Sequence, residues 1–388
     1  MATSVALEPD RTLATTVPRA LPAWIYNHPE MTRLELERIF RPSWQIACHV
    51  SQIPNSGDFW SFDLGLDSLV VIRDREKRVR GYHNVCRHRG ARLLDGGGHC
   101  PGTIVCPYHG WSYNYDGSLI GVPGKDSFPG LDRAEHGLKR VHAEVALGFV
   151  WVCLGSNPPP LKERFAPFMD ELAPYRFDDM VPLVPVSYEN WDVDWKVAID
   201  NYLESYHVPV GHPGLYRMFT PDYEDQKGAN GIARGTSWLR DQPSSRWSER
   251  FYQKLVGPTI NHLPDSHKKC WRFYSMLPNL GIDVYPELMD FFQVLPRGPG
   301  KCVIRYAIFG LPDERREMRV LRGLSNRINA SVNKEDRFLC ERVQRGLASP
   351  SYTPGPLSAL EHWMHDFHNL LRETIPEVRL AAAPARFA

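Results

Sequence analysis

The chain has 388 residues, of which 43% are hydrophobic and 23% are charged, enough to bury one large core or two smaller ones. Forty-six basic residues are balanced by forty-five acidic ones without a long block of like charge, which argues against a nucleic-acid-binding arm and gives no sign of a polyanionic partner. The eight scattered cysteines favour a reducing cytoplasm over secretion, and cysteines that cluster are expected to be ligands.

The first expected segment is residues 1–42, a leader followed by a helix that packs on the C-terminal domain. Its first twenty residues, MATSVALEPDRTLATTVPRA, lack the basic start and apolar run of a secretory signal, so we expect them to be loosely ordered. The most apolar stretch of the chain, EVALGFVWVCLG at 144–155, is far shorter than the roughly 20 residues that cross a bilayer. We therefore expect no membrane partner and a cytoplasmic protein.

The second segment, residues 43–155, has short apolar runs separated by glycine, asparagine and aspartate turns, which predicts an all-β domain. SLVVIRDREKRVRGYHNVC at 68–86 predicts a hairpin, because two β-rich arms flank a charged turn. The charged residues 73–80 are interpreted as a solvated hairpin tip, with a docking surface as the alternative. SNPPPLKERFAPF at 156–168 predicts a domain boundary, because three prolines precede a helix-compatible stretch.

The third segment, residues 156–388, alternates helical and strand-like text. Apolar periodicity predicts helices at WKVAIDNYLESYH, NKEDRFLCERVQRGL and LEHWMHDFHNLLRETI, which are residues 195–207, 333–347 and 360–375. Strands are expected within GIDVYPELMDFFQVLP and GKCVIRYAIFGLP, residues 281–296 and 300–312. The fold class is therefore α+β, a sheet with helices on it rather than a parallel βαβ series.

Two short loops each carry one cysteine and one histidine: Cys86 with His88, then Cys106 with His109. A zinc site is one interpretation, although structural zinc sites commonly pair cysteine with cysteine and histidine with histidine. Chance combined with core packing is a second, against which the glycines around both pairs argue. A Rieske [2Fe–2S] cluster is the third, with two cysteines on one iron and two histidines on the other. Only the third explains why each loop contributes one ligand of each type.

CRHRG at 86–90 and CPYHGWSY at 106–113 resemble the Rieske motif, Cys-x-His and Cys-x-x-His separated by sixteen or seventeen residues. The resemblance implies a [2Fe–2S] cluster on the four residues just named, whose neutral imidazoles raise its potential and suit it to accept electrons from a ferredoxin or flavin reductase. His99 and Cys100 belong to no matching pair and are interpreted as loop residues. Trp111 is expected to pack over the cluster, or to be an ordinary core tryptophan.

A second group of candidates lies in DNYLESYHVPVGHPGL, residues 200–215. Glu204 and His207 are three apart and are expected to share a helix face. Pro209 is expected to end that helix, so that His212 turns back toward His207. Two histidines and a carboxylate from elsewhere form the facial triad of non-haem Fe(II) oxygenases. A lone His-x₄-His pair more often has a structural role.

This run also resembles the Asn-x-x-Asp/Glu-x-x-His-x₄-His motif of Rieske non-haem iron oxygenase α-subunits, and the preceding NWDVDWKVAIDNYLE is similar to that family. The resemblance extends over about residues 40–375. It implies an all-β Rieske [2Fe–2S] domain followed by a helix-grip (START-like) catalytic domain with an antiparallel sheet and C-terminal helices.

The resemblance implies a mononuclear Fe(II) held by His207, His212 and Asp336. Asp336 lies in the helix expected at NKEDRFLCERVQRGL. The alternative is that Asn333 caps this helix and Asp336 is an acid in its first turn. Glu335 is the neighbour that could be mistaken for the ligand.

Two more residues of the motif receive catalytic roles from the resemblance. Asn201 is expected near the iron, with an ordinary polar helix position as the alternative. Glu204 would link the iron site of one subunit to His109 of the partner subunit, which implies a head-to-tail homotrimer. Many family members carry Asp at this position, whereas members acting on carnitine, betaine and related quaternary amines often carry Glu.

The resemblance implies a terminal oxygenase that uses O₂ and electrons from a separate NAD(P)H-dependent partner, a flavin/iron–sulfur reductase or a ferredoxin. The expected reaction is hydroxylation or oxidative N-demethylation of a small organic substrate, in particular a methylated or quaternary amine. Rings in KKCWRFYSMLPN and DVYPELMDFFQV are candidates for an aromatic cage around such a substrate, or are core residues. The alternatives are a mono- or dioxygenase of an aromatic acid or indole-type compound, and a Rieske electron-transfer protein without oxygenase activity.

Overall fold

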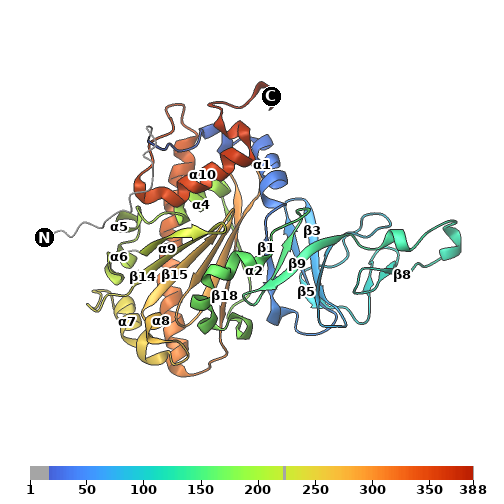
Figure 1. Ribbon diagram of the computed structural model, residues 1–388, viewed down its shortest axis with the longest axis horizontal. Coiled ribbons are helices and arrows are strands. Elements are labelled where there is room, and N and C mark those ends of the chain that lie inside the picture. The colour runs from blue at the N-terminus through green and yellow to red at the C-terminus, as the bar shows by residue number, and fades with distance from the viewer. Residues whose placement is uncertain (1–16, 222–223, 388) are drawn as a thin grey trace.

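The computed structural model describes residues 17–221 and 224–387, and of residues 224–227 only the backbone. The first sixteen residues of the expected leader lie outside the described residues. Within the described range the strands form three antiparallel sheets (Figure 1). The N-terminal sheet runs in the order β1 (Gln45–His49), β10 (Phe149–Cys153), β9 (Arg140–Ala146), β4 (Val79–His83), β3 (Asp67–Arg73), β2 (Asp58–Leu64) and β5 (Gly97–His99). A small sheet beside it contains β6 (Ile104–Val105), β7 (Ser112–Tyr113) and β8 (Leu119–Gly121).

The C-terminal part contains the third sheet, which helices flank (Figure 1). Its order is β11 (Val181–Pro182), β18 (Cys302–Gly310), β17 (Met289–Pro296), β16 (Leu280–Val284), β15 (Cys270–Met276), β14 (Ile232–Trp238) and β13 (Glu224–Ala229), and β12 (Ser187–Trp191) also pairs with β18. The predicted α+β fold class is confirmed.

The α-helices of the described residues lie mostly in this C-terminal part. They are α1 (Pro29–Glu35), α2 (Leu161–Phe165), α3 (Met169–Leu172), α4 (Trp195–Tyr202), α5 (Val208–Gly211), α6 (Pro213–Met218), α7 (Trp247–Thr259), α8 (Asp265–Lys268), α9 (Arg316–Leu347) and α10 (His362–Thr374). Helix α10 confirms the prediction for residues 360–375. Helix α1 is tied to α4, because Glu35 accepts hydrogen bonds from the Trp195 indole (2.7 Å) and the buried Lys196 ammonium (2.5 Å).

The helix predicted at 333–347 is α9, but it begins seventeen residues earlier, at Arg316. Its arginine-rich first half hides an apolar stripe in which Met318, Leu321 and Leu324 recur at helical spacing and are buried. Asn333 therefore lies inside the helix, and the interpretation of Asn333 as an N-cap is wrong. Asp336 occupies the middle of a long, well-anchored helix.

The helix predicted at 195–207 ends at Tyr202, so the expectation that Glu204 and His207 share a helix face is wrong. A continuous helix would place the ring of Pro209 against the carbonyl of Ser205, four residues earlier. Instead a new short helix, α5, begins after His207, and Pro209 occupies its first turn. The Glu204 carboxylate accepts the backbone N–H of His207 (3.0 Å) and stabilises this break.

The predicted hairpin is confirmed as β3 and β4, with Leu69 opposite His83. Its tip is solvated at residues 75–78, whereas Asp74 is 2% exposed and binds the guanidinium groups of Arg78 and Arg80.

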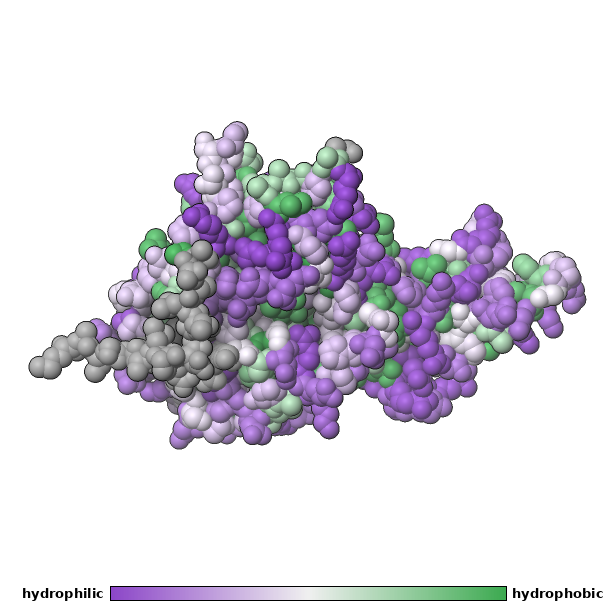
Figure 2. Space-filling view, turned by 45° about the horizontal axis from the view of Figure 1, so that its top comes forward, coloured by the Kyte–Doolittle hydropathy of each residue, from purple (hydrophilic) through white to green (hydrophobic). Residues whose placement is uncertain are grey.

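The face of the molecule in Figure 2 is predominantly hydrophilic, with apolar residues scattered over it. Among the described helices, none combines the length and apolar character needed to span a membrane.

Candidate metal centres

The two loops that carry the Cys and His pairs repeat the same backbone turn. The N–H of each cysteine donates to the carbonyl five residues later, at 2.8 Å for both Cys86 and Cys106. The glycine four residues after each cysteine donates back to the cysteine carbonyl, at 3.1 Å for Gly90 and 3.0 Å for Gly110. Both glycines have positive φ, +75° and +72°, a conformation that favours glycine. The backbone therefore shapes both loops alike.

The side chains of the two loops differ in exposure: the thiols are buried, His88 is half-buried and His109 is exposed. Cys86 and Cys106 are each 3% exposed, whereas His109 lies at the surface. The rings of His88 and His109 are 4.7 Å apart between centroids. Trp111 stacks on His88 at 4.9 Å and 8°, so it covers one face of that ring. Burial raises the pKa of the Cys86 thiol in the protein without metal.

These donors fit a [2Fe–2S] cluster. The thiols and the imidazoles are grouped separately, as the two irons of a Rieske cluster require. Nδ1 of His88 is buried and has no hydrogen-bond partner, which is the state expected of a ring nitrogen whose partner is a metal.

Sequence reasoning missed Tyr113 in this region. Its hydroxyl accepts the N–H of Arg87 (3.0 Å) and lies 3.3 Å from the Cys86 sulfur. A tyrosine so soon after a ligand pair was the available signal. His99 pairs with Asp58, and burial raises the pKa of Cys100 to about 11; the structure brings neither to the four predicted ligands.

The second motif converges on one point between α5, α6 and α9. His207 precedes α5, His212 separates α5 from α6, and Asp336 projects from α9. The two Nε2 atoms are 3.1 Å apart, and Oδ1 of Asp336 lies 2.9 Å from His212 Nε2 and 3.6 Å from His207 Nε2. Adjacent ligands of an octahedral metal at about 2.1 Å are about 3.0 Å apart, so these three donors fit a facial metal site. Asn201 donates to the same Asp336 oxygen (2.7 Å).

A carboxylate holds the other ring nitrogen of each histidine. Nδ1 of His207 is 2.5 Å from Glu204, and Nδ1 of His212 is 2.9 Å from Glu335. Such contacts place the proton on Nδ1 and leave Nε2 for a metal. The sequence did not predict the contact of Glu335 with His212, because Glu335 was interpreted only as an alternative to Asp336 as the metal ligand. A second acid beside a proposed ligand was the signal.

The charges around the three predicted iron ligands favour the binding of a cation. Burial alone would lower the pKa of His207, but hydrogen bonds with Asp336 and Glu204 raise it to about 9. Burial likewise opposes charge on His212, whose pKa is nevertheless raised by Asp336 and Glu335. Burial would raise the pKa of Asp336, yet the two histidines lower it to about 2. Protons and a metal ion would therefore compete for the two Nε2 atoms.

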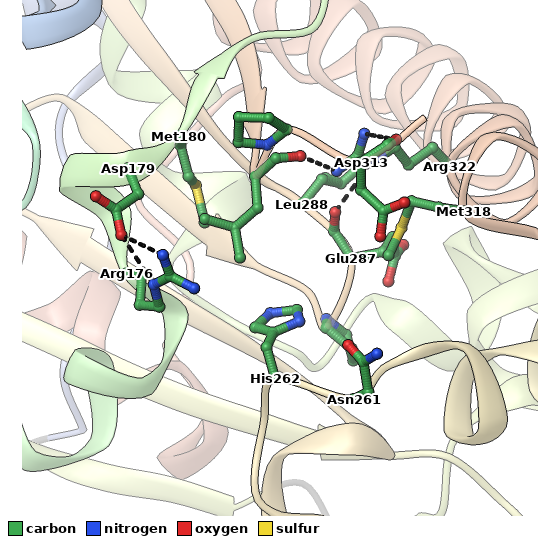
Figure 3. A pocket seen from close by; sticks show the side chains of 13 residues that line it. Arg176, Asp179, Met180, Asn261, His262, Glu287, Leu288, Asp313, Met318 and Arg322 are labelled. Atoms are coloured by element: carbon green, nitrogen blue, oxygen red, sulfur yellow. Dashed lines mark hydrogen bonds and ion pairs between the residues drawn. The ribbon is translucent and has the colours of Figure 1, made fainter. Parts of the chain in front are cut away.

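A cavity of about 500 Å³ lies near the start of α9 (Figure 3). Figure 3 shows His262 and Asn261 facing it and Arg176 paired with Asp179 (2.6 Å). Arg322 donates to backbone carbonyls on its rim, including that of Leu311 (2.7 Å). Fourteen residues separate Arg322 from Asp336, about 21 Å along the helix, so this cavity is remote from the predicted iron ligands.

Family models match most of the chain. The Rieske [2Fe-2S] domain matches residues 43–136, and the catalytic domain of the ring hydroxylating alpha subunit matches residues 177–377. A glycine betaine monooxygenase oxygenase subunit of Chromohalobacter salexigens is 29% identical over 94% of this chain and 88% of that protein. The chloroplastic choline monooxygenase of Beta vulgaris is 31% identical over 91% of this chain and 76% of that protein.

Solved structures share the fold. A crystal structure of the quaternary ammonium Rieske monooxygenase CntA superposes with a TM-score of 0.79 and 23% identity, covering 92% of this chain and 96% of that one. Naphthalene 1,2-dioxygenase from Rhodococcus sp. superposes with a TM-score of 0.73 and 19% identity, covering 91% and 93%. The same architecture thus occurs in enzymes whose substrates differ widely.

Proposed function

Because this chain belongs to the family of Rieske ring-hydroxylating oxygenase α-subunits, we propose that it oxidises a methylated ammonium compound. The family resemblance predicted from the two motifs is confirmed. The protein is an oxygenase with a Rieske [2Fe–2S] cluster and a mononuclear iron, and it uses O₂ and electrons derived from NAD(P)H. The single observation that carries the substrate class is the likeness, over more than nine tenths of this chain, to betaine and choline monooxygenases.

We assign the cluster to Cys86, His88, Cys106 and His109, on the repeated turns that present them. The iron would be held by the facial set on α5, α6 and α9, His207, His212 and Asp336. When bound there, the iron supplies the O₂-dependent oxidation of a substrate C–H bond.

The chain's own residues hold protons and orient ligands around the iron site. Glu204 and Glu335 keep the Nδ1 protons of the two histidines, so both Nε2 lone pairs face one point. Asn201 orients the Asp336 carboxylate through its amide N–H (2.7 Å). These contacts fix the ligands before substrate arrives, which limits reorganisation during reaction.

Electron entry is proposed to involve more than one subunit. Figure 1 shows β8, in the sheet next to His109, at the far end of the long axis from α5. Glu204 is 11% exposed while it contacts His207, so its carboxylate can link the iron site to a neighbouring copy. We assign its contact to His109 of the partner subunit in a head-to-tail homotrimer, with a flavin/iron–sulfur reductase or ferredoxin as the electron donor.

We also propose a Rieske domain at residues 43–155 and a catalytic domain at 156–388. A cytoplasmic location is part of the same proposal. All eight cysteines lie among the described residues and are unpaired and buried, as a reducing compartment would allow.

The test is turnover by the full-length holoprotein with a surrogate reductase, NAD(P)H and O₂. Two electrons from NAD(P)H and two protons reduce O₂, so that one oxygen atom enters a C–H bond and the other leaves as water. Hydroxylation of an N-methyl group gives an unstable carbinol that releases formaldehyde and the demethylated amine. We expect formaldehyde or aldehyde from glycine betaine, choline or carnitine. Oxidation of aromatic acids or indole, with none of any methylammonium compound, would overturn the substrate class.

Metal content separates the oxygenase from an electron carrier. The oxygenase should contain three irons and two acid-labile sulfides per chain, whereas a Rieske carrier would contain two of each. A native mass equal to one chain at assay concentration would contradict the intersubunit electron path.

A further inference from the structure

Two carboxylates, one buried and one half-buried, face each other on the C-terminal sheet. Asp283 of β16 and Asp290 of β17 are directly opposite in the strand register. Tyrosine hydroxyls donate hydrogen bonds to them: Tyr202 to Asp283 (2.6 Å), Tyr285 to Asp283 (3.5 Å) and Tyr306 to Asp290 (3.0 Å). Among the described side chains, neither carboxylate forms an ion pair with a lysine, arginine or histidine.

One oxygen of this pair lacks a partner altogether. Asp290 is 2% exposed, and its Oδ1 is buried without a hydrogen bond. Burial, with the charge of Asp336 adding to it, raises the pKa of Asp283 to about 7. Burial and the charge of Asp283 also raise the pKa of Asp290 well above its usual range. Two such acids are costly to ionise unless a positive charge lies between them.

The acid pair lies beside the proposed iron site. Tyr202, which donates to Asp283, directly follows Asn201, and Asn201 donates to Asp336. The ring of Tyr202 packs over Gly281 on the same face of β16, so Asp283 and the α4 end share that side of the sheet. A group held by the acid pair would therefore be close to the iron.

The side of the sheet that carries Asp283 also has accessible side chains and aromatic rings. Asp283 and Tyr306 are only half-buried, so part of each side chain remains accessible. Trp271 contacts Tyr285 at 4.6 Å between ring centroids, edge to face. A small cavity of about 20 Å³ between β14, β15 and the end of α4 reaches Tyr202.

We propose that Asp283 and Asp290 bind the positively charged nitrogen of the substrate and determine the preference for cations. The inference rests on the proposed function, since it names the residues that select an ammonium compound at that site. The two carboxylates supply the negative charge, and the surrounding aromatic rings suit the N-methyl groups. Those rings also favour an organic cation over a hydrated metal ion, which seeks oxygen ligands on all sides.

The test compares an ammonium compound with its neutral tert-butyl isostere, in which carbon replaces nitrogen. Choline and 3,3-dimethyl-1-butanol are such a pair. Dissociation constants are measured on the full-length holoprotein without reductase. We expect the wild type to prefer the cation and Asp290→Asn to reduce that preference by about tenfold or more, with iron content and cluster spectrum unchanged. Asparagine mimics the protonated acid in shape, and Asp283→Asn provides a second variant with the same expectation.

Glu287→Gln is the matched control. Glu287 is a buried acid of the same β16–β17 hairpin, but it contacts Tyr252 (3.0 Å) rather than the acid pair. We expect this variant to keep the wild-type preference. If the wild type turns over the cation and both aspartate variants retain the full preference, the inference fails while the proposed function stands. If the wild type neither binds nor oxidises any ammonium compound, both fail.

Discussion

At the cluster loops the backbone positions the ligands, whereas at the iron site carboxylate side chains do so. Gly90 and Gly110 allow one turn to be built twice, and Nδ1 of His88 has no protein partner. In contrast, the Nδ1 atoms of His207 and His212 are each held by a glutamate. The first arrangement suits a rigid cluster that brings its own geometry, and the second suits a single metal whose ligands must be oriented by the protein.

The largest effects should come from removing one ligand at each centre. His207→Ala should reduce iron from three to two per chain and abolish product formation, while the visible Rieske spectrum persists. Cys86→Ala should abolish that spectrum and leave Fe(II) binding at the second site. His142→Ala is the control, because His142 is exposed on β9. Iron analysis, absorption spectra and turnover measure these outcomes, and loss of the Rieske spectrum in His207→Ala would contradict the separation of the centres.

A smaller effect should follow when a positioning carboxylate loses its charge. Glu335→Gln should weaken Fe(II) binding by about 10- to 100-fold, because His212 loses the charged acceptor that orients its ring and makes it more basic. Titration of Fe(II) into anaerobic protein with an intact cluster provides the measurement. Glu341→Gln is the control, since Glu341 binds Arg337 on the same helix (2.9 Å). Equal affinities in the two variants would show that Glu335 does not support the metal.

The sequence predicted the fold class and both groups of candidate residues, because each motif is local and strongly patterned. It did not predict the end of α4 at Tyr202, since helical periodicity continues into a segment where Pro209 and the Glu204 carboxylate decide the conformation. It also missed the start of α9, whose arginines obscure the apolar stripe. The contacts of Glu335 and of the pair Asp283–Asp290 depend on tertiary packing, which single-chain spacing does not encode.

The carboxylates around the iron-site histidines also predict that Fe(II) binding depends on pH. The pKa of His207 is raised to about 9 without metal, whereas Fe(II) requires a neutral Nε2. Protons therefore compete with the metal below about pH 9, and affinity should rise by up to about tenfold between about pH 7 and about pH 8. Glu335→Gln is the comparison variant, because it removes a negative charge that raises the pKa of His212. Fe(II) affinity that is flat over this range would contradict the assigned hydrogen bonds.

The smallest effects should come from the glycines of the cluster loops. An alanine at positive φ costs about 1–2 kcal/mol, so Gly90→Ala and Gly110→Ala should lower the stability of the cluster region and spare Fe(II) binding. The cost should be larger at Gly110, where an added Cβ would lie 3.2 Å from Pro123, than at Gly90, where the space is open. The stability of the cluster region is measured as the denaturant concentration at which the Rieske absorption bleaches. Gly323→Ala on α9 is the control, because its Cβ would meet nothing within 4 Å and a helical alanine stabilises by about 0.5–1 kcal/mol. If Gly90→Ala and Gly110→Ala bleached no earlier than Gly323→Ala, the backbone would not be what positions the cluster ligands.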